Sequence, residues 1–235
     1  MKIFVISLKD AVERRQHIQS QFEGIGVPFE FLDAVDGRKE DHPLFDKYSL
    51  SKRMKTKGCE MTRGELGCFA SHYLLWEKCI QIEEPIIVIE DDAQLEKCFL
   101  ESFKDIKQLV QHDYVRLFVD GRGRKTKKLG TYKRHEIVQY LKGPGATRAY
   151  LITPKASRKF IDSAQEWYLP VDDYMDLFWI NKVPCKGIKP GMVKNETDFD
   201  SSIGELNRRD KKNKLSREIY SFKMSILRQL YLLRH

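Results

Sequence analysis

The segment "PIIVIEDDAQLE", residues 85–96, passes without a break from four branched aliphatic side chains to three carboxylates. Its apolar part shows no alternation with polar residues, which is typical of a central strand covered on both faces. Carboxylates at the end of such a strand repel one another and oppose ionisation. The segment therefore predicts a buried strand that delivers acidic groups to a place where a cation offsets their charge.

Four further apolar runs surround this strand, and helical patterns separate several of them. The runs are "IFVISL", "FEFLDA", "YVRLFV" and "AYLIT", and the clearest helical stretches cover residues 10–24 and 64–82. This alternation predicts an α/β fold with a mixed, mainly parallel sheet and helices on both faces. Ligands of open sheets bind outside the carboxyl ends of the strands, so the acidic residues should line the binding crevice.

The three acidic residues are Glu90, Asp91 and Asp92, and no His or Cys adjoins them in the sequence. Such hard oxygen ligands suit Mn²⁺ or Mg²⁺ and not zinc or copper. Strand geometry turns Glu90 and Asp92 to one side and Asp91 to the other, so we expect one or two metal contacts, chiefly through Asp92. The alternative is a solvated turn or helix start that binds no ion.

Composition narrows the class of protein. The chain has 235 residues, 41% of them hydrophobic, which suits an ordinary soluble globular protein with no repeat or linker. No stretch reaches the roughly eighteen apolar residues of a membrane span, and the first apolar run is too short for a signal peptide. The five cysteines contain no C-x-x-C pair. We therefore expect a reduced, cytoplasmic protein without structural zinc.

The net charge of +8 is concentrated at the C-terminal end. Residues 204–235 hold nine Lys and Arg against three Asp and Glu, a net +6, so residues 1–203 are nearly neutral and nucleic acid is not the expected partner. We expect residues 1–203 to form one domain and residues 204–235 a basic amphipathic helical tail. Its apolar stripe either packs on the body or lies on an anionic membrane; the stripe comprises Leu215, Ile219, Phe222, Ile226, Leu230 and Leu233.

Five segments together resemble the successive motifs of glycosyltransferase family 25. They are "VISLKDAVERR", "FLDAVDGR", "MTRGELGCFASHYLLWEKC", "IIVIEDDA" and "GATRAYLITPKA", within residues 1–203. The resemblance implies a GT-A-type nucleotide-sugar fold, a divalent metal (Mn²⁺ or Mg²⁺) and transfer with inversion at the anomeric carbon. It further implies UDP-galactose as donor and, as acceptor, a lipid-linked saccharide of lipooligosaccharide or lipopolysaccharide, presented at the cytoplasmic face of the inner membrane.

Donor-binding candidates follow from these motifs, each beside a purely structural alternative. A helix start near residues 7–10 offers backbone amides and arginines to phosphate, and acidic residues near a strand end offer acceptors to ribose or uracil. A capping box explains Glu65 equally well, packing explains a helical His, and an Asp-Gly turn explains Asp36. The candidates are Ser7, Leu8, Arg14, Arg15, Asp33, Asp36, Glu65, Ser71, His72 and Gly145.

Two adjacent aspartates in "LPVDDYMDLFW" are the candidates for the catalytic base. Asp172 and Asp173 follow a proline at an expected helix start, where an N-cap role is the structural alternative. An inverting displacement needs a base for the acceptor hydroxyl, and we favour Asp173 over Asp172. The basic, glycine-containing loop of residues 121–130 is the candidate lid; the alternative is a disordered surface loop that binds acceptor phosphates.

Two other classes of function use the same features. A metal-dependent phosphohydrolase or nucleotidyltransferase needs a second acidic cluster, which Asp198 and Asp200 could supply. A non-enzymatic basic protein that binds a membrane surface or nucleic acid explains the tail but leaves the acidic strand end unexplained. Oligomeric state is not indicated by any of these patterns.

Overall fold

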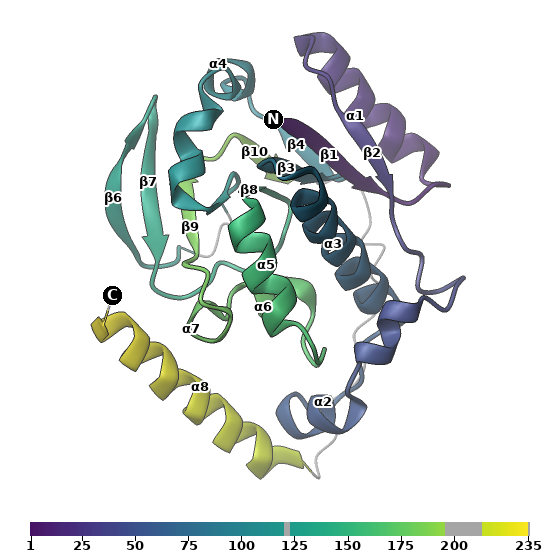
Figure 1. The fold of residues 1–235 in the computed structure, drawn as a ribbon, viewed down its shortest axis with the longest axis vertical. Coiled ribbons are helices and arrows are strands. Elements are labelled where there is room, and N and C mark those ends of the chain that lie inside the picture. The colour runs from purple at the N-terminus through teal and green to yellow at the C-terminus, as the bar shows by residue number, and fades with distance from the viewer. Residues whose placement is uncertain (120–122, 196–212, 235) are drawn as a thin grey trace.

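The computed structural model describes residues 1–119, 123–195 and 213–234 (Figure 1). The strands are β1 (Lys2–Ser7), β2 (Glu30–Asp33), β3 (Ile86–Glu90), β4 (Ala93–Leu95), β5 (Tyr114–Arg116), β6 (Thr126–Tyr132), β7 (His135–Tyr140), β8 (Ala149–Ile152), β9 (Lys186–Lys189) and β10 (Val193–Asn195). The α-helices are α1 (Val12–Ile25), α2 (Leu50–Thr56), α3 (Arg63–Ile82), α4 (Phe99–Phe103), α5 (Pro154–Ser163), α6 (Val171–Met175), α7 (Phe178–Asn181) and α8 (Lys214–Arg234). Two 3₁₀ helices cover Pro43–Lys47 and Ile106–His112.

The main sheet has the strand order β2-β1-β3-β8-β5-β9-β7-β6, which confirms the α/β class and a mixed sheet. Strand β3 lies between β1 and β8 with its four aliphatic residues fully buried, as the apolar run predicts. Parallel pairing joins β1 to β2 and β3, and β5 to β9. The other described pairings are antiparallel, so "mainly parallel" holds only for the part of the sheet that carries the acidic strand end.

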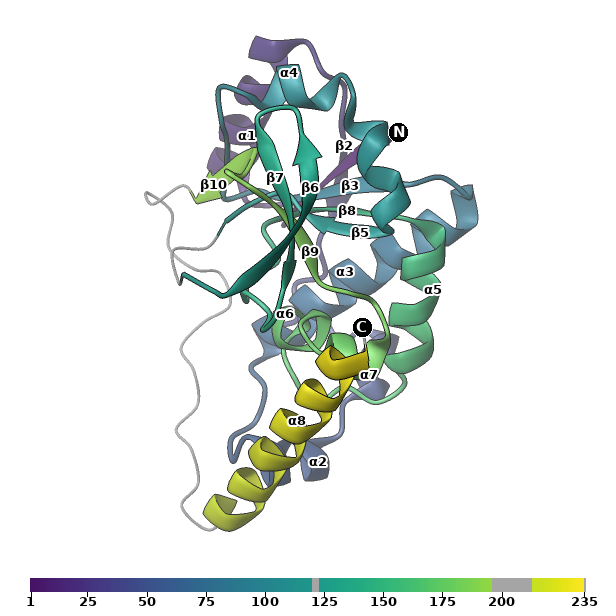
Figure 2. The same cartoon turned by 90° about the vertical axis from the view of Figure 1, so that its left-hand side faces the viewer.

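Helices cover both faces of the sheet, as predicted (Figures 1 and 2). On β3, Ile86 and Val88 join the core beneath α3, α5 and α6, whereas Ile87 and Ile89 join the core beneath α1 and α4. Successive residues of a strand point to opposite faces, so an unbroken aliphatic run fills both cores at once. Polar side chains can therefore occur only at the end of β3, where both faces are no longer covered, and the carboxylates begin at that position.

Local sequence signals explain where α3 begins. Thr62 accepts a hydrogen bond from the backbone N–H of Glu65, and the Glu65 carboxylate accepts one from Thr62, which completes the expected capping box. The helix starts at Arg63, one residue before the predicted stretch, and ends at Ile82 as predicted. The position of this helix start determines which polar residues of α3 lie beside the end of β3.

The basic amphipathic helix predicted at the C-terminal end is α8. It packs through Tyr231, Met224, Leu227 and Leu232 and leaves the predicted apolar stripe exposed. Of the two alternatives for this stripe, packing on the body is therefore wrong. The predicted boundary between residues 203 and 204 lies outside the described residues. Among the described helices, none has the length and apolar character needed to cross a bilayer.

Candidate functional site

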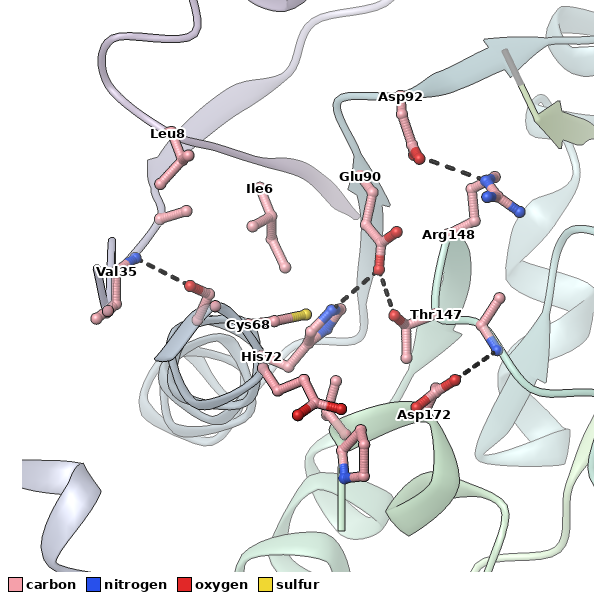
Figure 3. Close-up of a pocket in the computed structure, with 18 of the residues that line it drawn as sticks. Ile6, Leu8, Val35, Cys68, His72, Glu90, Asp92, Thr147, Arg148 and Asp172 are labelled. Atoms are coloured by element: carbon pink, nitrogen blue, oxygen red, sulfur yellow. Dashed lines mark hydrogen bonds and ion pairs between the residues drawn. The ribbon is translucent and has the colours of Figure 1, made fainter. Parts of the chain in front are cut away.

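A cavity of about 780 Å³ opens at the carboxyl ends of β1 and β3, between α3 and α6 (Figure 3). Its size suits a nucleotide-sized ligand. Twelve of the fifteen predicted site residues line it, although they come from five separate segments of the chain. They are Ser7, Leu8, Arg14, Asp36, Glu65, Ser71, His72, Glu90, Asp91, Asp92, Asp172 and Asp173.

Asp91 is committed to other side chains of the fold. Its Oδ2 accepts a hydrogen bond of 2.6 Å from the Ser7 hydroxyl, and its Oδ1 pairs with Arg14 at 2.9 Å. These contacts tie the end of β3 to the end of β1 and to α1. Asp91 therefore holds Arg14 at the cavity wall, in agreement with the expectation that it points away from Glu90 and Asp92.

Asp92 has the opposite character. Its Oδ1 is buried and accepts no hydrogen bond within the described residues, although it forms an ion pair with Arg148, whose Nε lies 3.6 Å away. Burial and the nearby charge of Glu90 raise the pKa of Asp92 to about 6. An unsatisfied carboxylate oxygen that resists ionisation is the group a divalent cation would satisfy. Asp92 therefore fits the role of metal ligand.

Glu90 sits in a hydrogen-bonded chain that begins in the core. The Trp76 indole N–H donates to the Tyr150 hydroxyl, which leaves the hydroxyl proton for His72 Nδ1 at 2.8 Å. On that tautomer, His72 Nε2–H donates to Glu90 Oε1 at 3.3 Å, and Thr147 donates to the same oxygen. Burial opposes ionisation of Glu90, but these hydrogen bonds outweigh it and lower its pKa. His72 thus orients Glu90 and is itself inaccessible to bulk water.

Although no His or Cys adjoins the carboxylates in the sequence, the fold brings one of each to Glu90. The ligand atoms of Cys68, His72 and Glu90 lie within 4.8 Å of one another (Figure 3). Cys68 precedes His72 by four residues, so both face the cavity from one side of α3. That spacing was the available sequence signal, but only the fold brings Glu90 to it. Burial raises the pKa of the Cys68 thiol well above its usual value, so the thiol does not favour metal on its own.

Two donor candidates of α3 have structural roles as well as a place in the cavity wall. The Ser71 hydroxyl accepts from the backbone N–H of Val35 at 3.0 Å and donates to the carbonyl of Gly67 at 2.8 Å. Glu65 is occupied by the capping box. Residues 34–37 are thereby held against α3, and Gly37 is required there because a Cβ would lie 2.0 Å from a backbone oxygen of α3.

Basic side chains surround the carboxylates. Arg14, Arg38, Arg53, Lys57 and Arg148 all line the cavity. Arg38 makes two hydrogen bonds to Asp36, at 2.8 and 3.0 Å, which hold the pKa of Asp36 below its ordinary value. Arg38 thus orients the Asp36 carboxylate, which keeps further acceptor sites for a ligand hydroxyl. Sequence reasoning missed four of these cations, since isolated arginines and lysines carry no local signal.

The two candidate bases lie on the opposite wall. Asp172 Oδ2 accepts from the backbone N–H of Ala146 at 3.2 Å, and Asp173 Oδ2 pairs with Lys57 at 2.6 Å. The N-cap alternative is wrong for both residues, because Pro170 is the N-cap of α6 and no side chain caps it. Both carboxylates lie in the first turn of α6, where the Asp172 Oδ1 accepts from the backbone N–H of Asp173 at 2.8 Å, and both are partly exposed.

Three predicted donor residues do not line the cavity. Arg15 donates to the carbonyls of Ser7 and Leu8, both at 3.0 Å, and pairs with Asp33. Gly145 donates its backbone N–H to Asp176 at 2.7 Å. Arg15 and Asp33 connect the ends of β1 and β2, and Gly145 anchors the loop before β8. They position the segments that line the cavity without lining it themselves.

The predicted lid and the predicted second acidic cluster remain to be placed. Residues 126–130 of the predicted lid belong to β6 and pair with β7, so this half of the loop is a strand because its residues complete the sheet edge. They do not line the cavity. Gly121 lies outside the described residues, as do Asp198 and Asp200 of the predicted second acidic cluster.

Comparison with known proteins reveals related sequences. The family described as "Glycosyltransferase family 25 (LPS biosynthesis protein)" matches residues 1–175. The chain is 32% identical to the lipooligosaccharide biosynthesis protein lic2B of Haemophilus influenzae over 167 residues, which are 66% of this chain and 60% of that protein. It is 27% identical to procollagen galactosyltransferase 2 of Mus musculus over 200 residues, 80% of this chain and 32% of that protein.

A third relative is named "Probable inactive glycosyltransferase 25 family member 3", from Bos taurus, and is 26% identical over 187 residues. The match covers 76% of this chain and 31% of that protein. The chain thus spans less than two thirds of each of these three relatives. Because the name of this relative includes "Probable inactive", similarity alone does not establish catalysis.

Proposed function

The chain belongs to glycosyltransferase family 25, and we propose that it transfers galactose from UDP-galactose, with inversion, to a lipid-linked saccharide acceptor of lipooligosaccharide or lipopolysaccharide. The names of two relatives, a lipooligosaccharide biosynthesis protein and a procollagen galactosyltransferase, support this acceptor class and this sugar. The two names point to different acceptors, lipooligosaccharide and procollagen. The choice of a saccharide acceptor therefore follows only the first of these relatives.

The observation that carries the proposal is the pairing of opposite charges in one cavity. Arg14 and Arg38 stand on the side of β1, and Glu90 and Asp92 end β3. The phosphates of a nucleoside diphosphate need positively charged partners. The arginines are such partners, and the carboxylates would bind a metal cation that contacts the same phosphates. A cavity that binds only a neutral sugar needs neither the arginines nor the cluster of carboxylates.

Asp92 and Glu90 are the residues that would hold Mn²⁺ or Mg²⁺. Asp92 offers the unsatisfied oxygen, and His72 with Thr147 fixes the carboxylate of Glu90. When bound, a divalent cation supplies positive charge that stabilises the diphosphate as it leaves. Arg14, held by Asp91, places a second positive group on the same side of the cavity.

Asp173 is the proposed general base, with Asp172 as its alternative. Its side chain is 45% exposed, at the rim where a large saccharide has access. The base takes the proton of the acceptor hydroxyl as that oxygen bonds to the anomeric carbon, and Lys57 orients the carboxylate. Asp172 is held by two backbone N–H groups, which favours a positioning role.

The decisive experiment is a hydrolysis screen with UDP-galactose, UDP-glucose and UDP-N-acetylglucosamine, in Mn²⁺ and in EDTA. We expect UDP and free sugar, fastest from UDP-galactose and only with metal. With an acceptor present, proton NMR of the product should show a β-linkage from the α-linked donor. Release of UMP and sugar phosphate would instead identify a phosphohydrolase, and a retained α-linkage would overturn inversion.

A further inference from the structure

The helix α8 is attached to the body by one face only. Tyr231 is buried against Phe178, with ring centroids 5.4 Å apart, and Arg228 lies over the Trp179 ring. Near the other end of the helix, the Ser216 hydroxyl donates to the carbonyl of Lys55 at 2.9 Å. These contacts with α7 and α2 fix which side of α8 faces outward (Figures 1 and 2).

The outward side carries a continuous apolar stripe, here called the α8 stripe. Its residues recur every three or four positions along five turns, and each is between 44% and 83% exposed. They are Leu215, Ile219, Phe222, Ile226, Leu230 and Leu233. A row of large apolar side chains in water is costly, and exposed patches of this kind mark interaction surfaces.

Positive charge accompanies the α8 stripe. Helix α8 contains five Lys and Arg against one Glu. Lys223 is exposed four residues after Ile219 and three before Ile226, and Arg234 is exposed four residues after Leu230, so both border the stripe. Lys214 is exposed at the start of the helix. Glu218, exposed three residues after Leu215 and four before Phe222, borders the other edge of the stripe. The complement of this surface is therefore apolar in its centre and anionic along the edge that carries Lys223 and Arg234.

We propose that the α8 stripe docks on the surface of an anionic lipid membrane. Acyl chains receive the apolar side chains, and headgroups neutralise the bordering cations. A second copy of the chain offers apolar side chains but no anionic surface, since its own α8 carries the same excess of Lys and Arg over Glu. The absence of any bilayer-spanning helix among the described residues is consistent with a helix that lies in the plane of the interface.

Docking in this way also orients the cavity. Helix α2 touches α8 through the Ser216 contact, and Arg53 of α2 and Lys57 at its end line the cavity. Lys57 in turn pairs with Asp173. The wall that carries the proposed base is thus joined to the membrane-docking helix through a single short helix. This orientation rests on the proposed function, whereas membrane docking itself does not.

The test is sedimentation of the full chain with vesicles of phosphatidylglycerol and phosphatidylcholine at low salt and in 0.5 M NaCl. We expect binding to anionic vesicles that salt weakens and that purely zwitterionic vesicles lack. Phe222→Gln with Ile226→Gln should lower binding on the order of 100-fold. Lys223→Gln with Arg234→Gln should lower it roughly fivefold for each charge removed.

Matched controls separate docking from folding and from catalysis. Val12→Gln with Leu129→Gln removes two exposed apolar side chains elsewhere and should leave vesicle binding unchanged. UDP affinity, measured by calorimetry, should be the same in every variant, since none of them lines the cavity. This readout keeps a failure of the sugar-transfer proposal distinct from a failure of docking.

Two results would overturn the proposal. One is unchanged vesicle binding in the Phe222→Gln, Ile226→Gln variant. The other is a dimer in light scattering that this variant dissociates, without any vesicle binding by the wild-type chain, which would assign the α8 stripe to a second copy.

Discussion

The three consecutive carboxylates at the end of β3 differ in what satisfies each of them. Asp91 is paired on both oxygens, Glu90 is held by His72 and Thr147, and Asp92 retains a buried oxygen without a hydrogen bond. Side chains of like charge can adjoin one another here because Asp91 is paired with Arg14 and Glu90 is held by hydrogen bonds. In contrast, burial and the charge of Glu90 outweigh the effect of Arg148 on Asp92 and leave that carboxylate under electrostatic strain. That strain is what a bound cation relieves.

Asp92→Asn should stabilise the metal-free protein at pH 8 by about 1–3 kcal/mol. The pKa of Asp92 is raised to about 6 in the folded chain, so the folded state holds this proton more tightly than the unfolded state does. The contribution of Asp92 to stability is most favourable below about pH 4 and is lost as the pH rises towards 6. Urea denaturation in EDTA at pH 4.5 and pH 8 measures it.

The same variant should lose Mn²⁺-dependent turnover. Equal stability of wild type and variant at pH 8 would contradict the strained carboxylate, and full activity would remove Asp92 from the metal site. Glu30→Gln, which changes an exposed acid outside the cavity, serves as the matched control.

Asp173→Asn should lower turnover of the acceptor reaction by roughly two to four orders of magnitude, with UDP affinity little changed. The loss follows from the missing proton acceptor, since the amide keeps the size of the side chain. Glu166→Gln breaks a comparable surface pair with Lys52 and should leave turnover intact. If Asp172→Asn is the more damaging change, the two aspartates exchange their assigned roles.

At the scale of elements, the site depends on how closely residues 34–37 approach α3. The backbone of this segment touches the first turns of the helix, and the Ser71 hydroxyl bonds to Val35 across the contact. Glycines at 37 and 67 allow the approach, since a Cβ at either would lie within 2.4 Å of a backbone oxygen. The cavity wall is thus set by helix-to-loop distance and not by any one polar residue.

Gly37→Ala should destabilise the protein by about 1–3 kcal/mol and weaken UDP binding, because the new methyl group pushes the segment away from α3. Gly24→Ala is the control: it lies in α1, a Cβ there meets nothing within 4 Å, and it should stabilise the helix by roughly 0.5–1 kcal/mol. Thermal denaturation and calorimetry with UDP measure the two effects. Normal UDP affinity in Gly37→Ala would show that this wall does not contact the donor.

At the scale of the whole molecule, a buried ion pair joins the sheet to the helical layer that carries the candidate base. Arg116 of β5 is fully buried and pairs with Asp176, just after α6, at 2.7 Å. Asp176 also accepts from the backbone of Gly145, so the loop before β8 is held at the same point. Burial raises the pKa of Asp176 to about 6 even with Arg116 beside it.

Arg116→Met should destabilise the protein by about 3–5 kcal/mol at pH 8, because it strands a buried carboxylate. The loss should be smaller at pH 5, where the raised pKa of Asp176 lets the group fold in its neutral form. Adding Asp176→Asn should recover part of the stability, as the amide oxygen still accepts from Gly145. A double variant less stable than Arg116→Met alone would contradict this account.

The sequence by itself determined the features that depend on residues near one another in the chain. The aliphatic run at 86–89 had to be buried on both faces, the capping box had to start α3, and the spacing after residue 214 had to form a two-faced helix. It also placed Ser7 and the carboxylates of residues 90–92 beside one cavity, because the carboxyl ends of the neighbouring parallel strands β1 and β3 meet at one sheet edge.

Only the tertiary structure decided which of these groups meet. Cys68 approaches Glu90, and Arg15 turns to Asp33 and away from the cavity, because distant elements set the distances between them. The antiparallel pairings of β8 with β3 and β5, and of β7 with β9, join segments far apart in the chain, which no local pattern encodes. The strand at residues 126–130 pairs locally with β7 in a hairpin, and that hairpin reaches the sheet through the contact of β7 with β9. The outward turn of the α8 stripe has the same cause: the helix pattern defines two faces, but Tyr231 packing on Phe178 selects the one that is buried.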